Sequence, residues 1–158
     1  MTIDSYFASL PDGFASVEQM RELLPAPVQK VAFVGVAGTA GKTAVAALLA
    51  ATLHAQGIRT GLYHAGCEPL AKRIRIDGAP VDEGPLGLTA EALSAAEPLP
   101  RDAAELTAAA RCFGEAGCTL AVVELPDAGL AEALPEMPVC AVTAVGPDGV
   151  SRSVERLA

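Results

Sequence analysis

Apolar residues occur along the chain in short runs that alternate with longer, helix-forming stretches. The β-branched and apolar run Lys30–Val36 predicts a strand buried on both faces, because strands of parallel sheets carry continuous apolar runs. Lys42–Gln56 follows as a strong helix, and Gly57 is typical of the residue that ends one. A second strand is expected at Arg59–His64. This order of strand, helix and strand indicates a βαβ unit.

The middle of the chain predicts a hairpin followed by a loop. Residues Arg73–Val81 alternate between polar and apolar and contain Asp77-Gly78, which is the pattern of a small β-hairpin. From Val81 to Pro100 the chain is rich in Gly, Pro and Glu, so we expect a mobile loop with a short helix over Thr89–Ala96.

The remaining pattern completes an α/β fold. The elements that we expect are a helix at Arg101–Ala116, a strand at Leu120–Leu125, a short helix at Ala128–Leu134, a strand at Val139–Val145 and the start of a helix at Ser151–Ala158. Together they predict a three-layer, P-loop-type domain with a mostly parallel sheet and helices on both faces. Residues 1–28 form a helical N-terminal lead-in, with a helix from Ser16 to Leu24, and residues 29–158 the P-loop domain.

Composition indicates a folded chain and narrows its partners. Hydrophobic residues make up 51% of the 158 positions and charged residues 19%, so we expect a packed core rather than disorder. A net charge of -8 argues against nucleic acid or an anionic membrane surface as partner. No apolar run reaches the roughly 18 residues of a membrane span, and the N-terminus lacks a signal-peptide pattern. The four cysteines show no C-x-x-C spacing, which favours reduced thiols in a cytoplasmic protein.

The loop between the first strand and its helix carries the candidate chemistry. It consists of Gly38, Thr39, Ala40, Gly41, Lys42 and Thr43. Small residues let successive backbone N–H groups turn inward as an anion nest, and the helix that begins near Lys42 directs its positive dipole end at the same place. We expect Lys42 to reach the β- and γ-phosphates of ATP and the Thr43 hydroxyl to ligate Mg²⁺.

This loop matches the usual G-x-x-x-x-G-K-[ST] pattern only in part, because Val36 stands at the first glycine position. The remaining G-T-x-G-K-T core lies between a buried strand and a helix, which is the context that the pattern requires. Nucleotide binding is therefore our interpretation. The alternative is a Gly-rich turn built for packing alone, with Lys42 in solvent.

Short motifs occur in four segments of the chain: Val36–Lys42, Gly61–Tyr63, Arg73–Pro80 and Ala144–Asp148. In this order they are similar to V-A-G-T-N-G-K, G-L-Y, R-I-R-V-N-G-x-P and S-I-G-L-D, which are motifs of the folylpolyglutamate synthase/dihydrofolate synthase family of the Mur ligase superfamily. Val122–Glu124 falls where this family has a strand ending in a metal-binding Glu. The resemblance implies a ligase that uses ATP and Mg²⁺ to phosphorylate a folate-like acid, which an amino acid then attacks to give an amide.

The same resemblance implies that Glu124 and Thr43 bind the metal ion, although Glu124 taken alone is equally a solvated or helix-capping carboxylate. The chain also departs from the family. Ala65 stands where the family has a metal-holding hydroxyl, Ala40 where Asn is usual, and Gly149 where a His is expected. No catalytic residue can be assigned. His64 is interpreted as structural.

Arg73 and Arg75 are interpreted as the solvent-facing side of the hairpin. The resemblance covers only the N-terminal part of the family's ATPase domain, so we expect a chain that is incomplete as a ligase on its own. One open function is a ligase fragment or subunit, completed by a homo-oligomer or by a partner protein that supplies the missing half. Another is a non-catalytic nucleotide-binding module that regulates or scaffolds a partner, and a third is a packing relic that binds nothing.

Overall fold

A six-stranded sheet forms the centre of the computed structural model, which describes residues 2–144. The strands are β1 (Ala32–Ala37), β2 (Thr60–Tyr63), β3 (Ile74–Ile76), β4 (Ala79–Pro80), β5 (Leu120–Glu124) and β6 (Val139–Val142). Their order across the sheet is β4-β3-β2-β5-β1-β6. Strands β2, β5, β1 and β6 run parallel, and the hairpin β3–β4 adds an antiparallel edge.

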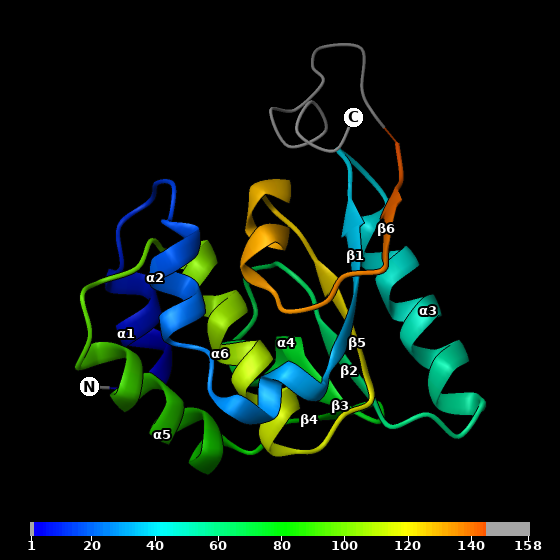
Figure 1. The fold of residues 1–158 in the computed structure, drawn as a ribbon, viewed down its shortest axis with the longest axis horizontal. Helices are drawn as coiled ribbons and strands as arrows, with labels where there is room; N and C mark the ends of the chain where they lie inside the picture. Colours follow the sequence, from blue (N-terminus) through cyan, green and yellow to red (C-terminus); the bar gives the residue numbers. More distant parts are fainter. Residues whose placement is uncertain (1, 145–158) are drawn as a thin grey trace.

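Helices cover both faces of this sheet, but unequally (Figure 1). The helices are α1 (Ile3–Ser9), α2 (Val17–Glu22), α3 (Lys42–Ala55), α4 (Leu70–Arg73), α5 (Glu83–Ser94) and α6 (Arg101–Glu115), with 3₁₀ helices η1 (Ala26–Lys30) and η2 (Ala128–Ala133). Within the described residues, α3 alone covers one face, whereas α1, α2, α5 and α6 gather on the other. The predicted α/β fold with helices on both faces is confirmed.

The hydrophobic core follows the same division. The larger cluster lies on the α6 side and includes Phe33, Tyr63 and Phe113, all fully buried. The lead-in helices α1 and α2 pack into this cluster and supply Phe7 and Met20. The smaller cluster, under α3, consists of five buried side chains: Val36, Ala46, Ala50, Leu62 and Val122. Some large apolar side chains stay exposed, among them Leu48 on α3 and Val139 and Val142 on β6, at the edge of the described sheet.

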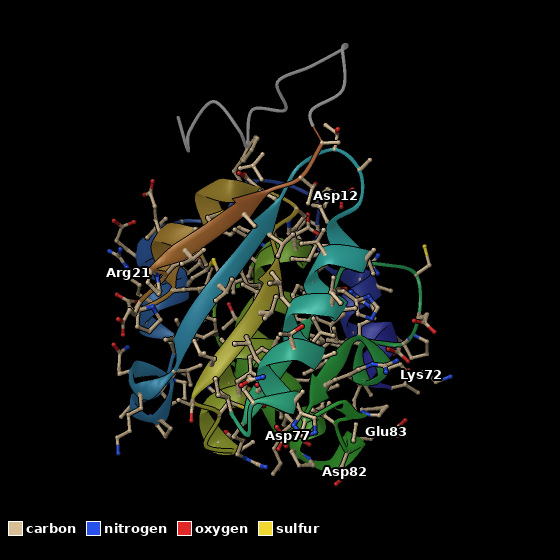
Figure 2. All side chains as sticks on the ribbon, turned by 90° about the vertical axis from the view of Figure 1, so that its right-hand side faces the viewer. Asp12, Arg21, Lys72, Asp77, Asp82 and Glu83 are labelled. Atoms are coloured by element: carbon tan, nitrogen blue, oxygen red, sulfur yellow. The ribbon has the colours of Figure 1, made fainter. Side chains whose placement is uncertain are left out.

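The turn of the β3–β4 hairpin is bonded to the start of β2 and to the C-terminal end of α3. Asp77 and Gly78 both have positive φ, 50° and 83°, which is the backbone that a tight two-residue hairpin turn requires. Asp77 lies below the C-terminal end of α3 (Figure 2). Its carboxylate accepts hydrogen bonds from Arg59 Nη1 at 2.8 Å and from the Thr60 N–H at 2.9 Å, and its Oδ1 lies 3.3 Å from His54 Nδ1. The turn is thereby tied to both neighbouring elements.

The largest error of the sequence-based prediction concerns residues 81–100. They are not a loop with a short helix at Thr89–Ala96, because α5 spans Glu83–Ser94. Leu86, Ala90 and Leu93 are buried on one face of α5, and that face packs on α6 and α1. The proline at position 85 lies in the first turn, where a backbone N–H has no intrahelical partner to lose. Burial of this face outweighs the local Gly and Pro content.

Other predicted boundaries differ less. Strand β6 ends at Val142 rather than at residue 145, and η2 is a 3₁₀ helix where a short helix was expected. The expected helix at residues 151–158, and the positions 148 and 149 considered above, lie outside the described residues. Cys112 and Cys118 are buried, and burial raises the pKa of each thiol to about 11. In the described range no helix is both long and apolar enough to span a bilayer.

Candidate functional site

The loop between β1 and α3 lies at the carboxyl end of the parallel strands, where α/β sheets bind ligands. Two glycines give it its shape. Gly38 has φ 131° and Gly41 has φ 82°, both in the region that side chains disfavour. Gly41 is the N-cap of α3 and offers no side chain to cap the helix. The first N–H groups of α3 therefore have neither an intrahelical partner nor a capping side chain.

Lys42 closes over this loop. Its Nζ donates a hydrogen bond to the carbonyl oxygen of Gly38 at 2.8 Å, and the side chain is half-buried. The ammonium group is thus held at the mouth of the loop rather than extended into solvent. A Lys42 side chain extended into solvent would favour the interpretation of the loop as a turn built for packing alone. The observed hydrogen bond to Gly38 does not favour that interpretation.

Glu124 brings three elements together at the end of β5. The residue is 4% exposed, and its Oε2 accepts hydrogen bonds from the Thr43 hydroxyl at 2.9 Å and from the Ala65 N–H at 3.2 Å. No basic side chain pairs with it among the residues that the structure describes. A buried carboxylate without a positive partner is costly in free energy, so this position favours a cation. Ala65 takes part through its backbone N–H.

His64 directly follows β2 and lies next to this site. Its Nδ1 is 3.1 Å from the Ala65 carbonyl oxygen, and its backbone N–H donates to the Arg73 carbonyl. Both contacts are local and tie the end of β2 to the following chain. They agree with the structural interpretation of His64.

A segment that follows β6 holds the loop from its other side, which the sequence did not indicate. The Thr143 hydroxyl lies 2.6 Å from the Ala40 carbonyl oxygen and 3.2 Å from that of Ala37. The Ala144 carbonyl oxygen accepts from both the N–H and the hydroxyl of Thr39, each at 2.8 Å. These contacts follow from the pairing of β6 with β1 and carry no local sequence signal.

Arg73 is not on the solvent-facing side of the hairpin, contrary to the sequence-based interpretation. It ends α4 and is buried, with Nη1 and Nη2 donating to the two carboxylate oxygens of Glu105 at 2.7 and 2.8 Å. Tyr63 Oη and Arg101 Nε donate to the same carboxylate at 3.0 and 3.1 Å. Burial, then the nearby charge of Glu105, raises the pKa of Tyr63 above its ordinary value.

This ion-pair cluster borders a cavity of about 290 Å³, which is also lined by Phe7 and by the exposed Cys67. The cluster joins α4, β2 and α6, and the hairpin follows directly from α4. The sequence placed Arg73 wrongly because alternation along a strand does not reveal a carboxylate that lies on a distant helix.

The side chains around Glu124 indicate which kind of metal ion they could hold. No group of three or more His, Cys, Asp or Glu side chains comes together within residues 2–144. A zinc-like cage is therefore not built by these residues. One carboxylate beside a hydroxyl at the start of a helix could instead hold Mg²⁺, which keeps several water ligands and takes one or two carboxylates plus phosphate oxygens. Thr43 and Glu124 fit such an ion.

Comparison with known proteins gives matches among solved structures. No family model matches the chain, and no curated protein does. Folylpolyglutamate synthase from Mycobacterium tuberculosis, complexed with ADP, matches at TM-score 0.70 and 26% identity over 82% of this chain and 32% of that chain. An FPGS–AMPPCP–folate complex matches at TM-score 0.77 and 22% identity, covering 94% of this chain and 42% of that one.

A bifunctional folylpolyglutamate synthase/dihydrofolate synthase from Yersinia pestis gives TM-score 0.70 and 22% identity over 90% of this chain and 37% of that chain. The chain thus spans about a third to two fifths of the length of these structures. Over the part that it spans, it has the α/β fold of folylpolyglutamate synthases, and the resemblance found in its sequence is confirmed at the level of structure.

Proposed function

We propose that the chain binds ATP with Mg²⁺ at the loop of residues 38–43. The single observation that carries the proposal is the meeting of Lys42, Thr43 and Glu124 at the uncapped start of α3. Glu124 is buried there and has no basic partner among the residues that the structure describes. Backbone N–H groups at a helix start attract anions, whereas Glu124 attracts a cation. A phosphate ligand with a bound metal ion would interact favourably with the N–H groups through its phosphate and with Glu124 through its metal ion. The ADP bound to the M. tuberculosis enzyme supports the assignment.

Lys42 would turn from the Gly38 carbonyl to the β- and γ-phosphates of the nucleotide. The bond that it makes at 2.8 Å holds the ammonium beside the loop. Exchange of this carbonyl for a phosphate oxygen replaces a neutral acceptor with a charged one, and charge-assisted hydrogen bonds are roughly twice as strong. Gly38, Thr39, Ala40 and Gly41 would contribute backbone rather than side chains.

The Thr43 hydroxyl and the Glu124 carboxylate would hold Mg²⁺. Thr43 already contacts Glu124 at 2.9 Å, so both ligands face one place. The ion would neutralise phosphate charge on an otherwise acidic protein with a net charge of -8. Ala65 would hold Glu124 in place through its N–H without ligating the ion.

The proposal extends to the chemistry of the similar enzymes. In an ATP-dependent ligase of a folate-like acid with an amino acid, a carboxylate oxygen of the acid attacks the γ-phosphorus of ATP and ADP leaves. The amine then attacks the carbonyl carbon of the resulting acyl phosphate, inorganic phosphate leaves, and an amide forms. The residues of this chain would position the phosphates and neutralise their charge, which is most of what phosphoryl transfer asks of a protein. A cytoplasmic location agrees with such a substrate.

A non-catalytic nucleotide-binding module is the second candidate. The observation that favours it is Ala65, which meets Glu124 with a backbone N–H where the similar family has a metal-holding hydroxyl. One fewer oxygen ligand weakens a site for a hard cation. The nest and Lys42 do not depend on that position, so nucleotide would bind while turnover would be slow.

Calorimetry with ATP and ADP, each with and without Mg²⁺, tests the proposal. The wild-type protein is expected to bind ATP, and Lys42→Ala is expected to weaken binding at least about tenfold through loss of a charge-assisted contact. The matched control is Lys30→Ala, an exposed lysine that precedes β1 and so lies at the opposite end of the strand that leads to the loop. Wild-type protein that binds neither nucleotide would overturn the proposal.

The two candidate functions differ in a second assay, which follows ADP release with Mg²⁺, glutamate and a panel of pteroates. Stoichiometric ADP and amide that vanish in Lys42→Ala support the ligase. Nucleotide binding without product under the same conditions supports the binding module.

A further inference from the structure

The loop of residues 38–43 is held from outside by the segment that leaves β6. Strand β6 pairs in parallel with β1 from Val34↔Val139 to Ala37↔Val142, so the two strands end together and the next residues reach the loop. Figure 2 shows β6 and β1 running side by side toward that end of the sheet. Thr143 and Ala144 then take up positions against the loop backbone.

The Thr143 side chain makes the central contacts. Its hydroxyl oxygen lies 2.6 Å from the Ala40 carbonyl oxygen and 3.2 Å from the Ala37 carbonyl oxygen, so one hydroxyl faces both the entrance and the middle of the loop. A Cβ built on Gly38 would lie 2.3 Å from the same hydroxyl oxygen. The absence of a side chain at Gly38 is therefore what allows Thr143 to approach.

These contacts orient the peptide groups of the loop. In a trans peptide the C=O of one residue and the N–H of the next point in opposite directions. The Ala40 carbonyl faces Thr143, so the Gly41 N–H points away from Thr143. The peptide between Gly38 and Thr39 follows the same rule: its carbonyl accepts from Lys42, and its N–H donates to Ala144 on the other side. The loop thus has a Thr143 side and a Lys42 side.

We propose that Thr143 is a positioning residue for nucleotide binding, whose hydroxyl fixes the peptide orientation that turns the Gly41 N–H toward the phosphates. This inference rests on the proposed ATP site. At this peptide the Gly41 N–H would attract phosphate oxygens, whereas an Ala40 carbonyl turned to the same side would repel them. Thr143 prevents that turn at Ala40. The residue itself touches no phosphate.

A hydroxyl deletion tests this role. Thr143→Val keeps the shape of the side chain and removes the donor, and Thr143→Ser keeps the donor. We expect Thr143→Val to raise the Kd for MgATP about fivefold to tenfold, which corresponds to one net hydrogen bond of ordinary strength, and Thr143→Ser to restore it. The melting temperature should change little, because Ala40 is exposed and water can replace the lost donor.

Thr52→Val is the matched control. The Thr52 hydroxyl on α3 donates to the Leu48 carbonyl at 2.8 Å, so the same chemical change removes the same kind of bond away from the loop. Its Kd should equal that of the wild type. The inference is overturned if Thr143→Val binds within twofold of wild type, if Thr52→Val weakens binding equally, or if Thr143→Ser fails to restore affinity.

Failure of the ATP proposal itself gives a different result. Wild-type protein that binds no nucleotide overturns both proposals. Wild-type binding that is lost in Lys42→Ala but kept in Thr143→Val overturns the role of Thr143 alone.

Discussion

Arg73 and Glu105 form a two-point ion pair in the interior of the protein. Two guanidinium nitrogens of Arg73 donate to the two carboxylate oxygens of Glu105 at 2.7 and 2.8 Å, and the two side chains are 3% and 4% exposed. Arg73 also donates from Nε to the Glu68 carbonyl. The pair joins the long helix α6 to α4, which leads into the hairpin. Its removal should therefore lower the stability of the whole fold.

Glu105→Gln should lower the free energy of unfolding by about 3–5 kcal/mol. The change removes the negative charge and leaves the Arg73 guanidinium buried without a counter-charge. Urea unfolding followed by circular dichroism measures the loss. The double variant Arg73→Met with Glu105→Leu should lose less than Glu105→Gln, since it leaves no buried charge.

The control for that measurement is the pair of Arg59 and Asp77. Its atoms lie 2.8 Å apart, but the side chains are 49% and 27% exposed. Arg59→Met should therefore cost below about 1 kcal/mol. An equal loss from both pairs would show that burial of the Arg73 pair is not what matters.

Stability should depend on pH through Glu105. Burial by itself would raise the pKa of this carboxyl, but the hydrogen bonds and charge of Arg73, with the bonds from Arg101 and Tyr63, bring it below its ordinary value. A group with a lowered pKa in the folded state binds fewer protons when folded, so it stabilises above its unfolded pKa of about 4.3 and loses that contribution as pH falls further.

The difference in unfolding free energy between wild type and Glu105→Gln should thus be constant near neutral pH and narrow below about pH 4. Urea titrations at several pH values measure it. A difference that stays constant down to the pH of acid unfolding would contradict the lowered pKa.

Gly61→Ala should destabilise the fold by about 1–3 kcal/mol or more, because an added Cβ would lie 2.5 Å from the Phe113 ring. The ring is fully buried and cannot move aside freely. Gly84→Ala is the matched change: its Cβ would meet nothing within 4 Å, and in the helix α5 it should stabilise by up to about 0.5–1 kcal/mol. Thermal melts of the two variants should shift in opposite directions.

Sequence patterns predicted the structure correctly where it depends on residues close together in the chain. The helix that follows the loop begins at Lys42 as expected, and the hairpin turns at Asp77 and Gly78 because that pair favours positive φ. The prediction failed at α5, where Gly and Pro content suggested a loop. What decides there is the packing of Leu86 and Leu93 against other helices, which local composition does not contain.

The same division applies to the candidate site. The residues of the loop and Glu124 were found from the strand–loop–helix pattern and from resemblance. The contact of Glu124 with Thr43 and the approach of Thr143 to the loop depend on strand order and register across more than 80 residues. No local pattern reports such pairings. The buried partner of Arg73 was missed for the same reason.

Glu124→Gln should reduce the gain in ATP affinity that Mg²⁺ provides, by about tenfold, since it removes the charge that would face the ion. Affinity measured in EDTA should change much less. Calorimetry with and without Mg²⁺ separates the two effects. Glu22→Gln, an exposed change at the end of α2, should leave both values unchanged. Equal loss with and without Mg²⁺ would mean that Glu124 only supports the loop.

The uneven covering of the sheet has a consequence for hydrogen exchange. Helix α3 buries only Ala46 and Ala50, whereas α6 on the opposite face is buried along most of its length. Amide protons of α3 should therefore exchange through local opening well before those of β1, β5 and α6. A nucleotide bound at the first turn of α3 would have to dissociate before α3 could open locally. Slowed exchange along α3, measured by mass spectrometry, would then report occupancy of the loop from the far end of the helix.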